Sequence, residues 1–513
     1  MPSPHATPPR GLDATRSPLF QGRFGRMFRN LQPAEFGATD DANNANLAAL
    51  GRAMVAGVDP PTDGKDPEES GIPALYTYFG QFVDHDITFD PTTTLTKFND
   101  PDGLTDFRNP ALNLDNVYGR GPNDQPYMYD GPMLFQLGDA LTGSNHPATD
   151  LPRFKGRALI GDLRNDENSI VSQLQGLFLR FHNRMVADNP QLSFEDVQQL
   201  VRFHYQYVVV HDFLPRIVIG AVLDDLKTNG HFDPRKLRFF HWRHNSFMPV
   251  EFSVAVYRLG HSMVRPGYRL NDDDANLLPI FPTTPGGPGL TGFQTMVPGR
   301  AIDWGRFIDI DIRAYDGTDA VKKKRLQFAY RIDASLVGPL ATLPAVIASD
   351  PSSLAERNLK RGWRLGLPSG QVVARAMALT PLADADIKIA KAVDTPDPAD
   401  GPVLSILDAV NAQGGDGSIF AGNCPLWTYI LSEAAHHRRK IKIPVTGNVE
   451  INTPQLGPVG GRILAEVFLG LLFGDSTSYL SLDPLWRPIT GAQFSLKDLV
   501  RSALGDGPAL HYR

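Results

Sequence analysis

The 513-residue sequence contains a single cysteine, Cys424, so no disulfide can form within the chain. A chain without disulfides depends on its hydrophobic core for stability and is compatible with a reducing compartment. Residues 1–5 have no basic segment followed by an apolar run, which is the pattern of a secretory signal. We therefore expect a soluble protein that is either cytoplasmic or exported without a conventional signal peptide.

The sequence also lacks a hydrophobic run long enough to cross a membrane. Its most apolar long stretch, residues 207–223, is interrupted by charged residues and a proline, so it predicts a buried helix and no membrane span. The net charge of −6 gives no reason to expect nucleic acid as a partner. With 42% hydrophobic and 21% charged residues, the composition is typical of a globular protein with a substantial core.

Several common catalytic and cofactor motifs are absent as well. There is no His-Glu-x-x-His, no cysteine pair suited to zinc, no P-loop and no Gly-x-Ser-x-Gly turn. No Gly-x-Gly-x-x-Gly follows a predicted strand. Metallohydrolase, nucleotide-binding and serine-hydrolase interpretations therefore lose their usual support.

Helical periodicity dominates what is present. The ranges predicted to contain helices are 41–56, 76–89, 167–189, 194–219, 374–379, 383–393, 403–413, 426–439 and 462–472. Strand patterns are few and short, the best being a possible hairpin over 442–451, and long Gly/Pro/Asp-rich stretches join the helices. We predict a mainly α protein: one large helical domain over 36–513 with long loops and very little β-structure, preceded by an extended arm over 1–35.

Polar groups that could carry chemistry are most concentrated in residues 80–86, Gly-Gln-Phe-Val-Asp-His-Asp. In a helix, Gln81, Asp84 and His85 share one face because they are three and four residues apart, whereas Asp86 points away from His85. One face would hold a base with two polar neighbours. Taken alone, such a cluster is more often a solvated surface or a helix cap, so partners elsewhere in the chain decide its interpretation.

Two further segments offer such partners. Arg164 and Glu167 are three residues apart at the opening of a predicted helix and can face one cavity, although a surface ion pair worth about 0.3–0.5 kcal/mol is the simpler interpretation. Arg258 and His261 have the same spacing on another probable helical turn. A lone histidine is more often a core residue, but an iron ligand needs one imidazole whose second nitrogen is held, and Asn358 is a candidate partner.

A loop-rich region after the first motif carries oxygen-bearing side chains at Asn109, Asn113 and Asp115. Such short alternation suits a hard cation such as calcium. Alternating Asn and Asp more often marks turns, so the pattern needs support from another part of the chain.

Taken together, these segments resemble the animal-type haem peroxidases of the peroxidase–cyclooxygenase superfamily, in its bacterial branch, with myeloperoxidase-like motifs. The resemblance runs from about Arg23 to Pro488. The matching motifs, in the family's order, are Gly80-Gln81-x-x-Asp84-His85-Asp86, Val117-Tyr118-Gly119, Gly161-Asp162-x-Arg164-x-x-Glu167, His182-Asn183-Arg184, Arg258-x-Gly260-His261, Asn358-x-x-Arg361-Gly362 and Gly457-Pro458-x-Gly460. Such an ordered series is far more specific than any single motif. It implies that residues 36–513 form a haem peroxidase domain.

The resemblance implies haem b as the cofactor and assigns roles to the two histidines. His85 would be the distal histidine and Arg164 the distal arginine, with Gln81 beside them. His261 would bind the haem iron, with its other nitrogen hydrogen-bonded to Asn358.

The resemblance also implies covalent haem links and a calcium ion. Asp84 and Glu167 match positions at which this family esterifies its haem, and Arg258 is expected at the cofactor. Asn168 stands where myeloperoxidase has a methionine bonded to haem through sulfur, so that bond cannot form here.

The implied calcium ligands are Asp86, Asn109, the backbone of Ala111, Asn113 and Asp115. The sequence departs from the family pattern here, because Asn109 and Asn113 replace the usual Thr and Asp, and Asp115 replaces a Ser. Negative charge is thereby redistributed and not lost, so calcium is still expected.

The implied activity is the reduction of hydrogen peroxide to water with oxidation of small donors, such as halides, thiocyanate or phenols, through a ferryl porphyrin radical. Two alternatives stay open. A fatty-acid dioxygenase or cyclooxygenase relative would carry a radical-forming tyrosine three residues before His261, where this chain has Arg258, with Tyr257 one place off. A non-catalytic haem- and calcium-binding module is the other, against which the joint presence of His85, Arg164 and His261 argues.

Overall fold

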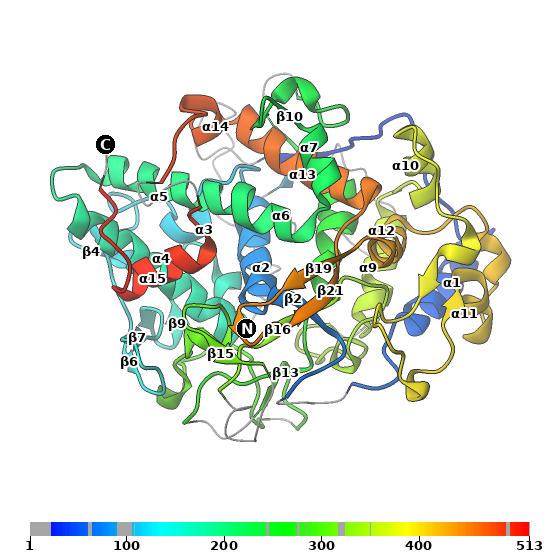
Figure 1. The fold of residues 1–513 in the computed structure, drawn as a ribbon, viewed down its shortest axis with the longest axis horizontal. Coiled ribbons are helices and arrows are strands. Elements are labelled where there is room, and N and C mark those ends of the chain that lie inside the picture. Colours follow the sequence, from blue (N-terminus) through cyan, green and yellow to red (C-terminus); the bar gives the residue numbers. More distant parts are fainter. Residues whose placement is uncertain are drawn as a thin grey trace.

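A computed structural model describes residues 22–59, 64–89, 105–106, 108–242, 246–273, 277–284, 286–315, 324–348, 350–488 and 493–511. Residues 1–21 of the predicted arm therefore lie outside the described residues. The α-helices are α1 (Asp40–Ala53), α2 (Leu75–Ile87), α3 (Asp115–Tyr118), α4 (Ser169–Asp188), α5 (Phe194–Val208), α6 (Leu214–Ile217), α7 (Gly220–Asp225), α9 (Leu354–Arg364), α10 (Gly370–Ala376), α11 (Ile406–Ala412), α12 (Leu426–His436), α13 (Pro458–Gly474), α14 (Tyr479–Leu482) and α15 (Leu496–Leu504) (Figure 1).

The strands are short. They are β1 (Gly22–Gly25), β2 (Glu69–Pro73), β3 (Thr105–Asp106), β4 (Tyr129–Asp130), β5 (Leu134–Phe135), β6 (Ala140–Leu141), β7 (Ala148–Thr149), β8 (Arg153–Phe154), β9 (Arg157–Ala158), β10 (Lys227–Thr228), β11 (His231–Phe232), β12 (Met248–Pro249), β13 (Gly267–Tyr268), β14 (Leu278–Pro279), β15 (Arg313–Ala314), β16 (Phe328–Tyr330), β17 (Lys388–Ile389), β18 (Leu404–Ser405), β19 (Arg438–Lys442), β20 (Val445–Thr446) and β21 (Glu450–Pro454). The predicted fold class, mainly α with very little β-structure, is confirmed.

The described part of the predicted arm joins the body as a strand. β1 pairs in parallel with β12 and antiparallel with β3, which forms a three-stranded sheet. Phe24 and Phe28 are buried in the main core. The boundary between arm and domain at residue 36 stays a prediction.

Some predicted elements are wrong in type or in extent. Residues 383–393 do not form a helix, because Asp384–Asp386 is a 3₁₀ turn and β17 follows. The alternation of buried Ile387 and Ile389 with exposed Lys388 fits a strand. The predicted hairpin over 442–451 exists, but its strands lie mostly outside that range, with Arg438 opposite Pro454 and Lys442 opposite Glu450.

The long predicted helix over 194–219 is divided into three segments. A π-helical turn, Val209–Phe213, separates α5 from α6, and α6 carries Pro215 in its first turn. The helix predicted over 426–439 ends at His436 because the following residues pair in β19.

Helix α2 lies in the middle of the molecule (Figure 1). Its apolar residues Phe79, Phe82, Val83 and Ile87 are fully buried, and the Phe82 ring stacks on Phe178 of α4 at 4.4 Å between ring centroids. Aromatic stacking of this kind adds to the free energy gained by burial. The polar residues Gln81, Asp84 and His85 lie between these apolar residues, so the packing of α2 fixes the directions of their side chains.

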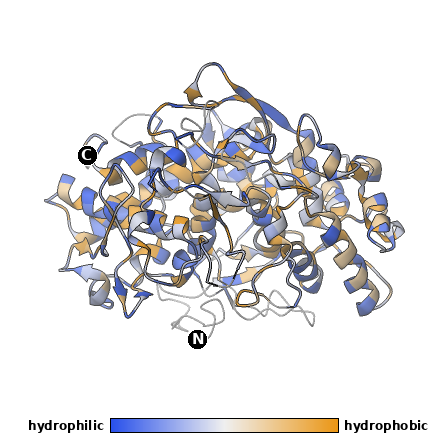
Figure 2. Cartoon of the chain, turned by 90° about the horizontal axis from the view of Figure 1, so that it is seen from below, coloured by the Kyte–Doolittle hydropathy of each residue, from blue (hydrophilic) through white to orange (hydrophobic). Residues whose placement is uncertain are grey.

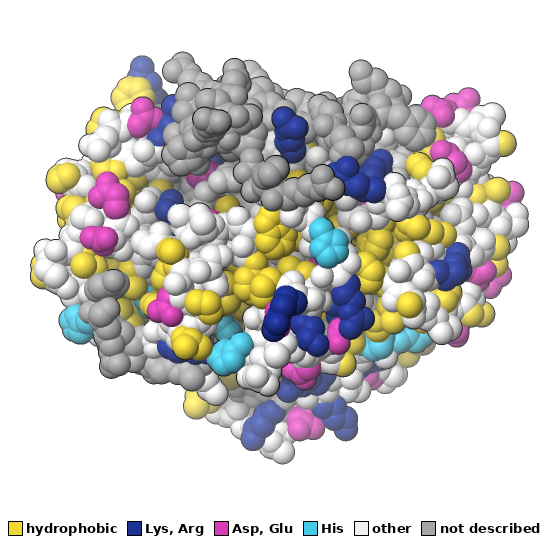
Figure 3. All heavy atoms as spheres, turned by 90° about the horizontal axis from the view of Figure 1, so that it is seen from above, with side chains coloured by type: hydrophobic (Ala, Val, Ile, Leu, Met, Phe, Trp, Pro, Cys, Tyr) yellow, Lys and Arg dark blue, Asp and Glu magenta, His cyan; other side chains and the backbone are white. Residues whose placement is uncertain are grey.

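The outer helices show one apolar and one polar side, as Figure 2 shows by the alternation of hydrophobic and hydrophilic segments. Figure 3 views the molecule from the side on which α14 and β10 lie in Figure 1, and hydrophobic side chains gather there in a band with basic side chains around it. In the described part of the chain, none of the helices has the length and apolar character required to span a membrane.

Candidate functional site

A cavity of about 2540 Å³ opens beside α2. A pocket for one drug-sized ligand is usually about 300–1,000 Å³, so this cavity has room for a large group and a second molecule. Its walls come from α2, α9, the 3₁₀ turn η4 (Leu163–Asp166) and the 3₁₀ turn η8 (Val256–His261). The predicted haem-site residues that line it are Gln81, Asp84, His85, Arg164, Glu167, Arg258, His261 and Asn358.

His85 is buried in one wall, and its ring is held from behind. Its Nδ1 lies 2.7 Å from Oδ1 of Asn165, and Nδ2 of Asn165 donates to Oε1 of Gln175 at 2.8 Å. Its Nε2 lies 3.9 Å from a carboxylate oxygen of Glu167. Burial, followed by the charge of Arg164, lowers the pKa of His85, so the imidazole is neutral at neutral pH.

The sequence prediction missed Asn165 and Gln175. Asn165 lies within the motif Gly161-Asp162-x-Arg164-x-x-Glu167, next to Arg164. Nothing in that motif indicates that Asn165 contacts His85. Gln175 lies inside α4, where its helical spacing marks only a buried position. Only the packing of α2 against η4 and α4 brings these amides behind the imidazole.

The Arg164 guanidinium is fixed on three sides. Nε and Nη2 donate to the Asp162 carboxylate, Nη2 also donates to the backbone oxygens of His85 and Thr88, and the guanidinium lies 4.6 Å from the centre of the Phe89 ring. Burial alone would raise the pKa of Asp162, but Arg108 and Arg164 outweigh it and lower that pKa. Within the described residues Nη1 has no hydrogen-bond partner, and the residue lines the cavity. The structure thus holds a charged guanidinium beside His85.

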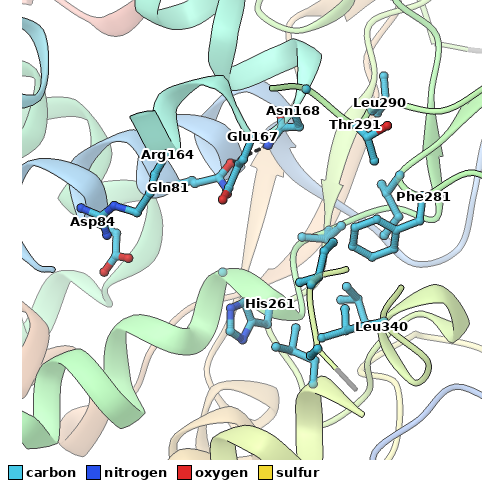
Figure 4. A pocket seen from close by; sticks show the side chains of 18 of the residues that line it. Gln81, Asp84, Arg164, Glu167, Asn168, His261, Phe281, Leu290, Thr291 and Leu340 are labelled. Atoms are coloured by element: carbon cyan, nitrogen blue, oxygen red, sulfur yellow. Dashed lines mark hydrogen bonds between the residues drawn. The ribbon is translucent and has the colours of Figure 1, made fainter. Parts of the chain in front are cut away.

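Gln81 ties α2 to the beginning of α4. Its amide nitrogen donates to Glu167, and its amide oxygen accepts from Nδ2 of Asn168 at 3.2 Å (Figure 4). Asn168 in turn caps α4, since its Oδ1 accepts from the backbone N–H groups of Ile170 and Val171. Gln81 of α2, itself held by Asn168, therefore fixes the Glu167 carboxylate at the cavity.

Asp84 and Arg258 form an ion pair that is longer than a hydrogen bond. Nη1 of Arg258 lies 3.8 Å from Oδ2 of Asp84, and Thr88 donates its hydroxyl to Oδ1 of Asp84 at 3.1 Å. Both side chains are partly exposed to the cavity, so this ion pair is weak. Asp84 and Glu167 are two cavity carboxylates on different elements.

His261 lies in the wall opposite Gln81 and Glu167 (Figure 4). It ends η8, which follows a π-helical turn, Glu251–Ala255, so this segment is helical but is not a regular α-helix. A Cβ added at Gly260 would contact nothing within 4 Å, so the backbone beside His261 is open to the cavity.

Asn358 of α9 contacts His261 as predicted, with 2.8 Å between Nδ2 of Asn358 and Nδ1 of His261. A half-turn of the amide places Oδ1 at the same point, where it accepts a proton from Nδ1. Burial and Arg258 lower the pKa of His261 to about 3, so the ring is neutral. A neutral imidazole with one nitrogen held by an amide is the form that ligates metals.

The remainder of the cavity wall is apolar. Phe281, Leu290 and Leu340 lie to one side of His261 in Figure 4. Val346 and Ile347, which also line the cavity, are 90% and 50% exposed. The cavity thus has a polar part between the histidines and an apolar part that reaches the surface.

The predicted calcium ligands are brought together only in part. Leu114 donates its backbone N–H to Oδ2 of Asp86 at 3.2 Å, which places Asp115 beside Asp86. Leu114 has a φ of 60°, a left-handed conformation that is uncommon for a bulky residue. Oδ1 of Asp86 and Oδ1 of Asp115 are buried without a hydrogen-bond partner among the described residues.

The two carboxyl groups are also electrostatically strained. Burial, followed by the charge of Asp115, raises the pKa of Asp86 well above its ordinary value, and burial raises the pKa of Asp115. The described chain contains no group of three or more His, Cys, Asp or Glu that could hold a metal, so amide and backbone oxygens would have to complete this site.

Among the described residues, no hydrogen bond joins the other three predicted ligands to Asp86. The backbone oxygen of Asn109 accepts from the N–H of Ala111, and that of Asn113 accepts from Nε of Arg202 at 2.6 Å. Oδ1 of Asn113 accepts from the N–H of Asp115 at 3.2 Å, which closes a turn. Each of these oxygens keeps a lone pair that could bind a cation. The hydrogen bonds that they accept, however, do not bring them to Asp86.

Tyr257, the residue next to the dioxygenase tyrosine position, is used in packing. Its hydroxyl donates to the backbone oxygen of Gly80 at 3.0 Å, and its ring stacks on Phe252. Gly80 suits this close packing, since a Cβ at this position would lie 3.3 Å from Cζ of Phe213, closer than an ordinary van der Waals contact.

Comparison with solved structures defines the class of fold. Peroxidase A from Dictyostelium discoideum superposes over 94% of this chain and 92% of its own, with a TM-score of 0.57 and 15% identity. Fatty acid alpha-dioxygenases superpose over 93% of this chain, the Oryza sativa enzyme over 79% of its own chain with a TM-score of 0.51 and 15% identity, and that of Arabidopsis thaliana over 78% with 0.52 and 14%. The chain has the helical fold that these peroxidases and dioxygenases share.

Sequence comparison relates one segment of the chain to a known family. Residues 133–284 match the family model described as animal haem peroxidase. A dual oxidase from Drosophila melanogaster is 30% identical over 137 residues, which cover 25% of this chain and only 8% of that protein. This segment is similar to the animal haem peroxidases, which confirms the predicted resemblance. Neither comparison bears on the bacterial branch.

The matched segment includes some candidate residues and omits others. Arg164, Glu167, Arg258 and His261 lie within residues 133–284, whereas the motif at 80–86 and Asn358 lie outside them. The contacts of His85 with Asn165, and of Asn358 with His261, join the outside residues to the matched ones.

Proposed function

We propose that the protein is a haem-dependent peroxidase, which reduces hydrogen peroxide to water and oxidises small donors such as halides, thiocyanate or phenols. One observation carries the proposal: a neutral imidazole and a fixed guanidinium, His85 and Arg164, share one wall of a cavity whose opposite wall presents the neutral imidazole of His261. A base beside a cation is the pair that heterolysis of a peroxide bond requires.

The residues present fit haem b. The cavity is large enough, Gly260 opens the backbone beside His261, and the apolar side chains of Phe281 and Leu340 suit a porphyrin face or edge. We assign His261 as the iron ligand and Asn358 as the group that holds its Nδ1. Haem bound there supplies the electron-transfer chemistry.

The chain itself moves a proton and stabilises a charge. With Nδ1 protonated, Nε2 of His85 has a lone pair toward the cavity, so it accepts the proton of one peroxide oxygen and returns it to the other, which leaves as water. Nη1 of Arg164 stabilises the negative charge that develops on the departing oxygen. Its guanidinium does not need to move, because Asp162 and two backbone oxygens hold it. Gln81 lies beside this pair.

Covalent attachment of haem is part of the proposal. Asp84 and Glu167 are carboxylates on different elements that both line the cavity, so each can reach a different edge of one flat group. Arg258 lies 3.8 Å from Asp84 and would sit at the haem periphery. Ester bonds at both positions would prevent extraction of haem by acid acetone.

We also propose a calcium ion between Asp86 and the loop after residue 108. The support is the pair of buried carboxylate oxygens without partners, on Asp86 and Asp115, which a hard cation would satisfy. Asn109, the backbone of Ala111, and Asn113 would complete the ligands. Because Asp86 follows His85 on α2, a bound ion would fix the helix turn that carries the base.

A fatty-acid dioxygenase is the second candidate, and the apolar part of the cavity favours it. Val346 and Ile347 at the rim and Phe281 inside would suit an acyl chain. Against it, Arg258 occupies the radical-tyrosine position, and the Tyr257 hydroxyl is engaged with Gly80. Peroxidase is therefore preferred.

The two functions differ in what they consume. The full chain, loaded with haem and calcium, should consume hydrogen peroxide in proportion to the oxidation of iodide, bromide, thiocyanate or a phenol. Oxygen uptake with palmitate, with no donor oxidation, would instead establish the dioxygenase. If neither peroxide nor oxygen is consumed while haem stays bound, the protein is a haem-binding module without catalysis.

A further inference from the structure

Two buried amides behind His85 form a hydrogen-bonded chain that the proposed mechanism does not yet use. Asn165 and Gln175 have no exposed surface, and His85 is 5% exposed. The three side chains come from η4, α4 and α2 respectively. Each link is short, at 2.7 Å from His85 to Asn165 and 2.8 Å from Asn165 to Gln175.

The direction of this chain determines which ring nitrogen of His85 carries the proton. An asparagine amide presents either an acceptor oxygen or a donor nitrogen. Here Nδ2 of Asn165 donates to Oε1 of Gln175, so the atom that faces the imidazole is Oδ1. The chain ends at Nε2 of Gln175, which is buried and has no hydrogen-bond partner among the described residues. An oxygen acceptor requires a proton on Nδ1, and Nε2 then keeps its lone pair.

The reversed arrangement would make His85 useless as a base. If both amides turned over, Asn165 would donate to Nδ1, and the ring proton would sit on Nε2, toward the cavity. A protonated Nε2 cannot accept a proton from a substrate. The oxygen of Asn165, by contrast, serves His85 both before and after Nε2 is protonated, because Nδ1 keeps its proton throughout.

We infer that Asn165, oriented by Gln175, is a positioning residue that keeps His85 in the Nδ1-protonated tautomer with Nε2 directed into the cavity. The consequence for catalysis rests on the proposed function, but the tautomer itself does not. The charged groups that face His85 are Arg164, Glu167, Asp162 and Asp84. Among the described residues, none of these makes a hydrogen bond to Nδ1, so Asn165 alone fixes that nitrogen.

A purely structural role would be the alternative, since buried amides commonly only satisfy one another. The chain offers a matched control in Asn189, which is equally buried and donates its amide N–H groups to the backbone oxygens of Met185 and Leu510. Replacing either asparagine by leucine leaves a comparable polar group unsatisfied. Of the two, Asn165 is the one that forms the hydrogen bond to a catalytic-site histidine.

The test reads the tautomer directly from the full-length chain, labelled with ¹⁵N only in histidine. The signals of His85 are assigned by their loss in His85→Gln. We expect a protonated Nδ1 and an unprotonated Nε2 at neutral pH. Asn165→Leu should introduce the Nε2-protonated form, Asn165→Asp should restore the original tautomer because it keeps the oxygen, and Gln175→Met should give a mixture because Asn165 is then free to turn.

Activity supplies the second measurement. In the haem-loaded chain, Asn165→Leu should lower the rate constant for reaction with peroxide by about tenfold or more, a part of the roughly 10²–10⁴-fold that a positioned base contributes, with the KM for the donor unchanged. Asn165→Asp should recover most of this loss. Asn189→Leu should lower the unfolding temperature but leave the peroxide rate intact.

The outcomes separate this inference from the proposed function. A wild-type His85 protonated on Nε2, or a tautomer unaffected by Asn165→Leu, would overturn the inference whatever the activity. The expected tautomers in a chain that consumes no peroxide would support the inference and refute the proposed function. If Asn165→Leu does not fold, Gln175→Met and Asn165→Asp decide, since the first must disturb the tautomer and the second must not.

Discussion

The two histidines that face the cavity each have Nδ1 beside an asparagine amide. They differ in whether that asparagine is itself held by a further buried side chain. Each ring has Nδ1 within 2.8 Å of an asparagine amide, Asn165 for His85 and Asn358 for His261. Behind Asn165, the buried chain continues to Gln175. Asn358 lies on α9 and lines the cavity itself, and its second amide atom has no such fixed partner among the described residues.

The charges around the two rings also differ. Arg164 is beside His85 with its guanidinium bound to Asp162. Arg258 near His261 lies 3.8 Å from the Asp84 carboxylate and donates from Nε to the backbone oxygen of Ser253 at 2.9 Å. Burial lowers the pKa of both histidines, so both rings are neutral. The two rings differ in their surroundings. The fixed guanidinium beside His85 favours proton transfer, whereas the open backbone at Gly260 beside His261 favours the binding of a planar group.

The largest expected effect is the loss of haem when the ring of His261 is removed. His261→Gly should abolish the intense Soret absorption of the loaded protein, because no other imidazole lies on that side of the cavity among the described residues. Absorption spectra after gel filtration measure this. His182→Gln is the matched control, since His182 is buried but bonds only Tyr118 and the Met133 carbonyl; it should cost stability and keep the band.

Removing the ring of His85 should leave haem binding intact and lower the rate of reaction with peroxide. His85→Gln should retain haem and its Soret band but lower the rate constant for peroxide by about 10²–10⁴-fold, the usual contribution of a general base. Stopped-flow measurement of the reaction with peroxide checks this. Equal loss of haem in His85→Gln and His261→Gly would contradict the difference drawn between the two rings.

The sequence was sufficient to predict the fold class, both members of the His261–Asn358 pair, and His85 without its partner Asn165. Helical periodicity located most helices, and ordered motifs identified His85, Arg164, Glu167 and His261 as neighbours of one cavity. Asn358 was paired with His261 across 97 positions because both belong to motifs. Helical spacing separated Asp86 from His85, and the structure places Asp86 beside Asp115.

The sequence could not predict contacts that depend on how elements pack. Asn165 and Gln175 carry no pattern that links them to His85, since buried polar residues in helices have many roles. The strand β17 was missed because its short alternation of Ile387 and Ile389 is also compatible with a helix. The loop that carries the predicted calcium ligands was identified from residue types, but its left-handed Leu114 follows from the fold.

Asn358 is the amide that holds Nδ1 of His261. Asn358→Leu should leave haem bound but weaken its affinity by about 10–100-fold, the usual effect of removing a partner behind a metal ligand. Titration of the haem-free chain with haem measures the affinity. Asn358→Asp should retain it, because a carboxylate oxygen accepts the proton of Nδ1. An unchanged affinity in Asn358→Leu would show that the amide does not position His261.

Removal of calcium should affect the His85 side alone and change turnover less than the substitutions above, because the ion would fix the helix turn that carries His85 without contacting the imidazole. The removal of calcium should leave haem bound to His261 and lower stability. If the free ion is present at 100 times its dissociation constant, it should stabilise the chain by about 2.7 kcal/mol. Thermal unfolding with calcium or with a chelator measures this difference, and Asp86→Asn should abolish the response.

The pH dependence of that difference provides a sharper test. The pKa of Asp86 is raised in the folded chain, so without calcium the folded state holds a proton that the unfolded chain releases. The contribution of the protonated Asp86 carboxyl to stability is fully present below the ordinary pKa of 3.8. It is lost as the pH rises through the raised pKa of Asp86 in the folded chain. The chelated protein should therefore lose stability as the pH rises toward neutrality, and calcium should reduce that loss because it neutralises Asp86 and Asp115 when they are ionised. A calcium effect of the same size at every pH would place the ion elsewhere.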